Sequence, residues 1–133
     1  MKKNIHATVE LTKQGFSGYV EMEGGIIVSD GETLEELKIN LKGALALHIE
    51  DLKTEGINVQ KLENCDIDLN LDVKALFEML SSINVTGFAN YSGMNRSLLG
   101  QYLTGKKSPS EKQSKKILAN VNKLGEQLAS IHY

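Results

Sequence analysis

The stretch GFANYSGMNRSLLGQYLTGKKSPS, residues 87–110, is the part of this chain whose spacing is most informative about its fold. The small residue Ala89 is followed by Gly93 four positions later, and Leu99 comes six positions after Gly93. Two helices that cross closely need a small side chain at the crossing, a glycine in the turn and an apolar anchor on the second helix. The spacing therefore predicts two short helices joined by a tight turn, the second capped by Asn95.

The second predicted helix has two different faces. Its apolar stripe faces inward and consists of Leu98, Leu99, Tyr102 and Leu103. The opposite stripe suits base edges in a DNA groove, because arginine pairs with guanine and glutamine with adenine, and lysines in the following loop suit phosphates. We therefore predict a helix-turn-helix that binds double-stranded DNA, with contacts from Asn95, Arg96, Ser97, Gly100, Gln101, Lys106 and Lys107. A helical hairpin with a basic loop by chance is the alternative that these residues leave open.

The same stretch resembles the helix-turn-helix of the lambda-repressor/Cro-like (XRE-type) regulators. In that family an Ala-x-x-x-Gly step leads through a polar N-cap to x-x-x-L-x-x-Y-L-x-G-K-x-x-P-S. The matching positions here are Ala89, Gly93, Asn95, Leu99, Tyr102, Gly105, Lys106, Pro109 and Ser110. The resemblance implies binding to operator DNA. Gly100 departs from the pattern, since such regulators usually carry a polar or basic side chain at that position.

Charge divides the chain into two parts of opposite sign. Residues 1–82 carry eight lysines and no arginine against fifteen acidic residues, a balance of −7. Residues 83–133 carry six lysines and one arginine against two glutamates, a balance of +5. Such a division indicates that the two parts face different partners, and the basic part suits a polyanion.

The acidic part shows the patterns of a small sheet covered by a helix. Apolar and polar residues alternate over 5–11 and 16–22, and a third short strand follows a turn at Glu23–Gly25. A long helix with leucines at three- and four-residue spacing follows its N-cap Thr33, with Glu36 in the capping-box position and Gly56 at its end. Alternation over 65–72 predicts a fourth strand, so the order is β-β-β-α-β.

From Lys74 onward the strand patterns stop and helical ones take over, so we predict an α+β module at 1–73 and an all-α domain at 74–133. Ser110 is the expected N-cap of a long last helix. Its apolar residues step by four and three: Ile117, Val121, Leu124, Leu128 and Ile131. We expect the first of them to pack on the helix-turn-helix and the last to form a seam between two copies of the chain.

The acidic module resembles the HicB antitoxins, a family whose N-terminal module is a truncated RNase H-like β-β-β-α-β fold. The resemblance lies in the hairpin around Gly15–Tyr19, the sequence Gly31-x-Thr33-x-Glu35-Glu36 before the helix, and the Leu/Ala-rich helix that follows. HicB proteins carry a DNA-binding domain, in some cases a helix-turn-helix, after this module. The resemblance implies that the acidic module covers a HicA-like toxin, a small basic ribonuclease that cleaves mRNA, and that it has no RNase H activity itself.

The remaining chemistry favours no enzyme. Asp66, Asp68 and Asp72 could hold Mg²⁺ for phosphodiester cleavage, but alternating aspartates equally belong to a solvated strand face. The three histidines have no metal-ligand spacing and Cys65 is the only cysteine, so we expect neither a metal nor a cofactor. No stretch approaches the ~18 apolar residues of a membrane span, and a cytoplasmic protein is expected.

The leading hypothesis from the sequence is an antitoxin of a HicAB-type toxin–antitoxin system. In this hypothesis the C-terminal domain binds the operator of its own gene as a homodimer or higher oligomer, and the N-terminal module neutralises the toxin. The alternative is a stand-alone helix-turn-helix regulator whose N-terminal module serves dimerisation or ligand sensing.

Overall fold

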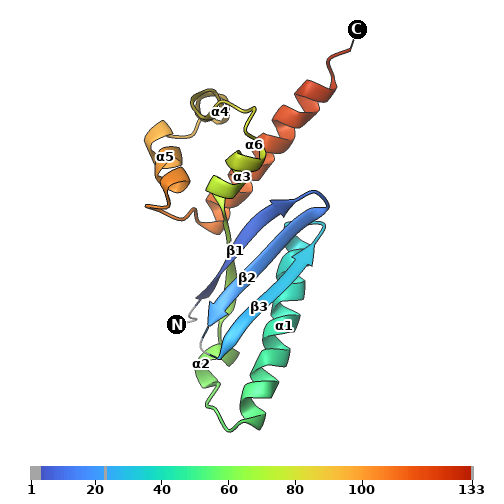
Figure 1. The fold of residues 1–133 in the computed structure, drawn as a ribbon, viewed down its shortest axis with the longest axis vertical. Helices are drawn as coiled ribbons and strands as arrows, with labels where there is room; N and C mark the ends of the chain where they lie inside the picture. The colour runs from blue at the N-terminus through green and yellow to red at the C-terminus, as the bar shows by residue number, and fades with distance from the viewer. Residues whose placement is uncertain (1–3, 23, 133) are drawn as a thin grey trace. The chain divides into compact units, whose positions relative to one another are not determined.

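A computed structural model describes residues 4–22 and 24–132. The chain divides into two compact units, Met1–Asn70 and Leu71–Tyr133. The first unit contains β1 (Asn4–Thr12), β2 (Gly15–Met22), β3 (Gly25–Gly31), α1 (Leu34–Thr54), α2 (Gln60–Glu63) and β4 (Asp66–Leu71), except that Leu71, the last residue of β4, belongs to the second unit (Figure 1). The second unit contains α3 (Val73–Met79), α4 (Val85–Ser92), α5 (Arg96–Thr104) and α6 (Glu111–Ala129). The predicted turn residue Glu23 lies outside the described residues.

The four strands form one mixed sheet in the order β3-β2-β1-β4. The first three make an antiparallel meander in which Thr8 pairs with Tyr19 and Tyr19 with Val28. Side-chain hydrogen bonds join β1 to β4, from Asn4 to Asp68 at 2.9 Å and between His6 and Asn70 at 3.0 Å. Both pairs are separated by 64 residues, and a constant separation is the register of parallel strands. The predicted α+β class and the four strands are confirmed.

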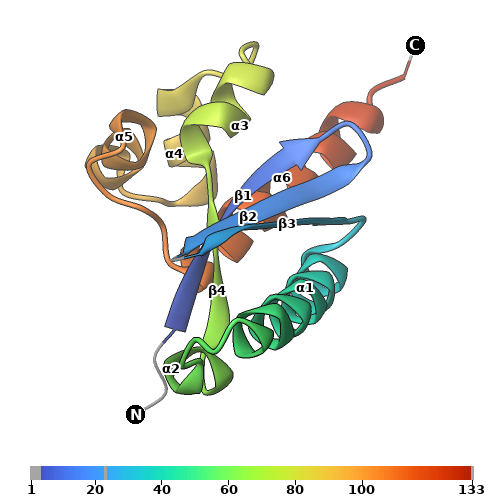
Figure 2. The ribbon, with the colours of Figure 1, turned by 60° about the horizontal axis from the view of Figure 1, so that its bottom comes forward.

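Helix α1 covers one face of the sheet (Figure 2). Its N-cap Thr33 accepts a hydrogen bond from the Glu36 N–H at 3.1 Å, and its leucine stripe is buried. A Cβ added at Gly18 would lie 3.2 Å from the side chains of Leu37 and Leu41, so Gly18 faces the helix. The residues in register with Gly18, Val9 on β1 and Ser29 on β3, therefore face α1 as well.

The short helix α2 between α1 and β4 was not expected from the sequence. The Asn58 side chain accepts a hydrogen bond from the Gln60 N–H at 3.0 Å and starts this single turn. Lys53 near the end of α1 forms an ion pair with Glu63 at 2.6 Å, and the hydrogen bond that Lys53 donates to Glu63 raises the pKa of Lys53. One turn is too short to show a helical period in the sequence, so no pattern predicted it.

The alternation over 65–72 predicted that Asp72 lies on a strand face, and this prediction is wrong. Strand β4 ends at Leu71, and the Asp72 carboxylate caps α3 by accepting a hydrogen bond from the Ala75 N–H at 3.0 Å. The competing preference of aspartate for helix N-caps explains the difference, because alternation alone does not mark the residue at which a strand ends.

The core of the second unit joins all four of its helices. Phe77 of α3 and Phe88 of α4 meet edge to face with their ring centroids 5.3 Å apart. Leu99 of α5 and Ile117 of α6 have no exposed surface. Ser114 is the buried polar residue among those that the structure describes. Its hydroxyl accepts a hydrogen bond from the Leu71 N–H at 3.0 Å and donates one to the Ser110 carbonyl at 2.9 Å. Among the described residues, no helix is both long and apolar enough to cross a membrane.

Candidate nucleic-acid interface

The turn between α4 and α5 has the backbone that the sequence predicted. Gly93 adopts the left-handed conformation with φ of 69°, which a residue without a Cβ takes at little cost. The Gly93 N–H donates hydrogen bonds to the carbonyls of Ala89 and Asn90, and the Met94 N–H donates one to the Ala89 carbonyl at 3.0 Å. Met94 is buried. These contacts close the end of α4 and fix the direction in which the chain leaves it.

Asn95 caps α5, as predicted. Its side-chain oxygen accepts a hydrogen bond from the Leu98 N–H at 3.0 Å while its own backbone stays extended. The far end of α5 is closed by Gly105 at φ of 79°. Helix α5 therefore has fixed ends, and its first residue after the cap is Arg96.

The inner face of α5 holds the helix against the rest of the unit. Leu99 is fully buried and Tyr102 is 7% exposed. Burial raises the pKa of the Tyr102 hydroxyl. The small residue Ala89 on α4 is 1% exposed, and α4 and α5 contact each other. The predicted division into an inner and an outer stripe is thus borne out for these anchors.

The seven residues predicted to contact DNA fall on the outer side of α5 and in the loop after it. Arg96, Ser97, Lys106 and Lys107 are exposed, as is the cap Asn95, while Gly100 and Gln101 are partly exposed. Within the described part of the chain, Arg96 and the two lysines form no ion pair. The Lys107 N–H bonds the Gln101 carbonyl at 3.3 Å, so the basic loop is tied to α5. Three cations in one short segment are therefore available to an anionic partner.

Gly100 leaves a bare spot on the outer side of α5, one helical turn after Arg96. A Cβ added there would meet no atom within 4 Å, so packing inside this protein does not require glycine. A glycine within a helix costs about 0.5–1 kcal/mol relative to alanine. An alanine would therefore fit at this position and favour the helix.

Two contacts of the second unit were not predicted from the sequence. The Tyr91 hydroxyl of α4 donates a hydrogen bond to Gln127 of α6 at 2.8 Å, and the Lys123 ammonium lies 5.8 Å from the centre of the Tyr91 ring. Both join helices that are far apart in the sequence, so no local pattern signals them. They brace α4 against the long helix α6.

Asp66 and Asp68, the aspartates of β4, are engaged with protein groups. Asp66 accepts a hydrogen bond from the Ile67 N–H at 2.9 Å and lies 3.3 Å from the Lys42 ammonium, and these contacts, the first foremost, hold its pKa below the usual value. Asp68 accepts a hydrogen bond from Asn4. In residues 4–22 and 24–132, no group of three or more His, Cys, Asp or Glu side chains is placed to hold a metal ion.

The helical pair and its basic loop therefore form the best-defined candidate site, and its support is the geometry of residues 84–107. Comparisons of the chain with protein-family models, with curated proteins and with solved structures find no match in any of the three.

Proposed function

We propose that this protein is a DNA-binding antitoxin of the HicAB type, which represses its own operator through the second unit and neutralises a basic HicA-like toxin through the first. The observation that carries the proposal is the capped α4–α5 pair with exposed Arg96 one residue after its N-cap and Lys106–Lys107 just beyond it. The resemblance to HicB proteins and the acidic sheet support the toxin-binding half.

In the DNA-binding half, α4 and α5 act as a helix-turn-helix. The start of α5 enters the major groove, where recognition helices of this motif contact base edges. Arg96 and Gln101 hydrogen-bond bases, and Ser97 contacts a base or a phosphate. Lys106 and Lys107 bind phosphates, which adds affinity that falls with salt and carries no sequence information.

The end of α6 provides the dimer contact of this proposal. Its apolar residues keep the four-three spacing of a coiled-coil seam. Ile117 is buried in its own unit, whereas Leu128 near the helix end is 59% exposed. Helix α6 ends at Ala129, so Ile131, which is 74% exposed, lies beyond the helix on which the sequence had placed it. In the proposed dimer, these apolar residues pack against the same residues of a second copy. The two-fold symmetry that results suits a palindromic operator.

Arg96→Ala is expected to lower the preference for operator over random DNA by about tenfold or more, because one paired arginine–guanine contact accounts for about 1–3 kcal/mol of discrimination. Lys106→Ala is expected to weaken binding to both DNAs alike and to lower the salt slope by about one. The measurement is a salt titration of binding to the promoter fragment upstream of the gene, with Lys13→Ala, a charge loss in the other unit, as control. If neither variant changes binding to any promoter fragment, α4 and α5 are only a packing motif.

The toxin-binding half uses the face of the sheet opposite α1, which we call the open sheet face. Residues directly opposite one another in the register share a face, so Thr8, Tyr19 and Val28 form one row across it. Glu10 and Asp30 lie in the next row, and Glu21 is opposite Ile26. Asp68 joins the same face through Asn4.

Charge and exposure on the open sheet face fit a basic protein. The four strands contain five acidic residues and no lysine or arginine: Glu10, Glu21, Asp30, Asp66 and Asp68, of which Asp66 pairs with Lys42 of α1. Ile26 and Val28 lie on the edge strand β3 of this face, beside Glu21 and Asp30, and are 57% and 59% exposed. Exposed apolar side chains beside residues of one charge sign are typical of an interface, and complementary potentials speed the encounter with a basic partner.

Val28→Lys is expected to weaken toxin binding about tenfold or more, because it places a cation against a basic partner and removes an apolar contact. The matched control is Ile39→Lys on the outer side of α1, where Ile39 is 69% exposed. The measurement is co-expression with the product of a neighbouring small basic gene, followed by pull-down and titration. Equal binding by the two variants would rule out the open sheet face, and failure of the unaltered protein to capture any basic partner would rule out the antitoxin role.

A stand-alone regulator that senses a ligand is the second candidate. The observation that favours it is a pocket within the first unit, lined by residues of β1, α1 and α2 among others. Both functions include operator binding, so operator binding cannot separate them. A toxin-like gene beside this one would favour the antitoxin, and the lack of such a gene would favour the stand-alone regulator.

A further inference from the structure

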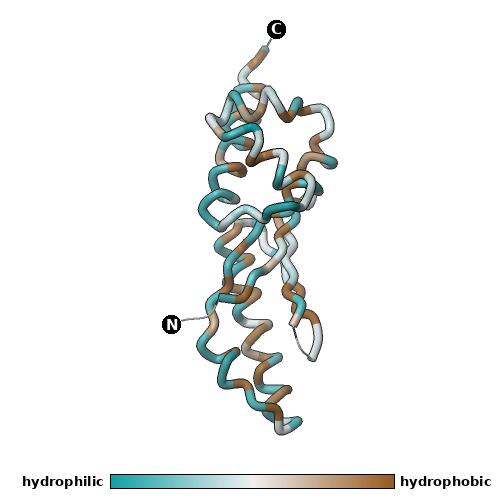
Figure 3. Tube along the Cα trace, turned by 90° about the vertical axis from the view of Figure 1, so that its left-hand side faces the viewer, coloured by the Kyte–Doolittle hydropathy of each residue, from teal (hydrophilic) through white to brown (hydrophobic). Residues whose placement is uncertain are grey.

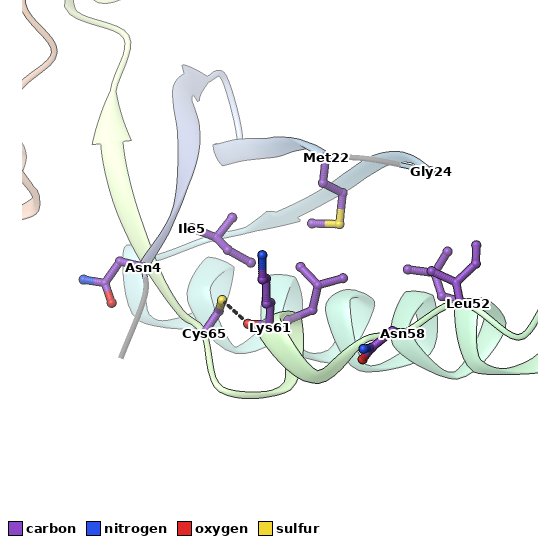
Figure 4. Close-up of a pocket in the computed structure, with 10 residues that line it drawn as sticks. Asn4, Ile5, Met22, Gly24, Leu52, Asn58, Lys61 and Cys65 are labelled. Atoms are coloured by element: carbon purple, nitrogen blue, oxygen red, sulfur yellow. Dashed lines mark hydrogen bonds between the residues drawn. The ribbon is translucent and has the colours of Figure 1, made fainter. Parts of the chain in front are cut away.

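The first unit contains a pocket of about 420 Å³ where the strand ends meet the helices, within the range of about 300–1,000 Å³ typical of small-molecule sites. Figure 4 shows two rows of lining residues, one from the ends of β1 and β2 and the other from the end of α1 and from α2. The lining residues are Asn4, Ile5, Met22, Gly24, Leu52, Ile57, Asn58, Lys61, Leu62 and Cys65. All of them belong to one compact unit.

The pocket wall is mostly apolar. Ile5 and Met22 approach from the strand side and Leu52 from the helical side (Figure 4). Leu62 of α2 and Ile57, between α1 and α2, also line the pocket. Figure 4 shows the rows facing each other over an elongated space. Such a wall binds an apolar chain by removing it from water, at about 25 cal/mol per Å² of apolar surface.

Among the described residues that line the pocket, Lys61 is the charged one. Its side chain extends from α2 toward the strand ends, between the two rows (Figure 4). Within the described residues Lys61 has no ion pair. The backbone carbonyl of Lys61 accepts a hydrogen bond from the Cys65 thiol at 2.8 Å, so the thiol already has a hydrogen-bond partner. An unpaired ammonium over an apolar wall favours a ligand with a single negative charge.

A second polar group lies beside the other end of the pocket. His48 is one helical turn before Leu52, and its Nε2 atom is buried with no hydrogen-bond partner among the described residues. That atom lies 3.8 Å from the place where a Cβ at Gly24 would stand, and Gly24 is part of the wall. A buried polar atom without a partner costs about 1–3 kcal/mol, so a polar ligand atom that reaches it stabilises the complex.

We propose that this pocket binds a small amphipathic monocarboxylate, whose apolar chain lies along Ile5, Met22 and Leu62 and whose carboxylate pairs with Lys61. A cationic ligand is disfavoured, because the described lining contains a lysine and no acidic residue. A nucleotide is disfavoured as well, since the described lining residues include no aromatic side chain for a base to stack on. The inference goes beyond the antitoxin role and depends on neither the operator nor the toxin.

The test is a titration of the full chain with octanoate, followed by ¹⁵N NMR, with octanol and octylamine as head-group controls and butyrate as a chain-length control. Octanoate is expected to shift the amide signals of Gly24, Asn58 and Cys65, with weaker effects from octanol and butyrate and none from octylamine. Lys61→Gln is expected to lower the affinity for octanoate about tenfold, the loss of one charge-assisted contact. Lys13→Gln, in the turn at the opposite end of β1, is expected to leave it unchanged.

Three outcomes overturn the proposal: no binding of octanoate, equal binding of octanoate and octylamine, or shifts confined to residues outside the pocket. The proposal is also overturned if the Lys61→Gln variant binds octanoate as tightly as the unaltered chain does. None of these outcomes bears on operator binding or on capture of a toxin, which are measured with different partners.

Discussion

Gly31→Ala is expected to destabilise the first unit by about 1–3 kcal/mol or more, the usual cost of forcing atoms into a packed site. The added Cβ would lie 2.5 Å from the Leu37 backbone nitrogen and 2.9 Å from the Leu37 Cα. Backbone atoms of α1 cannot rotate away as a flexible side chain can. The helix must therefore move off the sheet, and the leucines that it buries there lose their contacts.

Gly43→Ala is the matched control, because Gly43 is also in the first unit and its added Cβ would meet no atom within 4 Å. This second variant is expected to raise stability by about 0.5–1 kcal/mol, since alanine favours a helix over glycine. The measurement is hydrogen exchange of α1 and β2 amides in the full chain, with urea unfolding as support. Equal stability of the two variants would mean that α1 does not approach β3 as closely as described.

Leu99→Ala is expected to destabilise the second unit by about 2–5 kcal/mol, the range for removing a buried leucine side chain from a core. Leu99 has no exposed surface and is the anchor by which α5 is held to the unit. Loss of this anchor frees α5, so operator binding is expected to fall even though the variant keeps every cation of the interface.

Leu98→Ala is the comparison for Leu99→Ala, because Leu98 is the neighbouring leucine of α5 and is only partly buried. Leu98→Ala is expected to destabilise the second unit clearly less than Leu99→Ala does. Hydrogen exchange of α5 amides gives the stability of the second unit, and β2 amides report whether the first unit is unaffected. A Leu98→Ala variant as unstable as Leu99→Ala would contradict the role of Leu99 as the anchor of α5.

Local signals in the sequence predicted much of the fold. The caps Thr33, Asn95 and Ser110 each accept the expected hydrogen bond, and Gly93 has the positive φ that its place in the turn demanded. These features depend on residues within three positions of one another, so they are visible in the sequence. The four-strand sheet was also predicted, because alternation records which face of each strand is buried.

Features that depend on distant residues could not be predicted. Helix α2 is a single turn with no period of its own, and the alternation over 65–72 did not show that Asp72 caps α3 instead of extending β4. The pocket is made by residues from Asn4 to Cys65, which only the finished fold brings together. At the candidate interface the sequence predicted which residues face outward, but the open space at Gly100 became evident only from its surroundings.

The half-buried apolar stripe of α6 has a consequence for how the protein responds to its own abundance. Ile117 holds α6 to its own unit, and the exposed Leu128 near the helix end and Ile131 just beyond it leave little surface for pairing with another copy. In the dimer that we propose, a contact of this size gives weak self-association, so we expect most copies to be single at low concentration. Where two copies must bind one palindrome, occupancy then rises with the square of the concentration, and repression begins sharply at a threshold instead of growing in proportion.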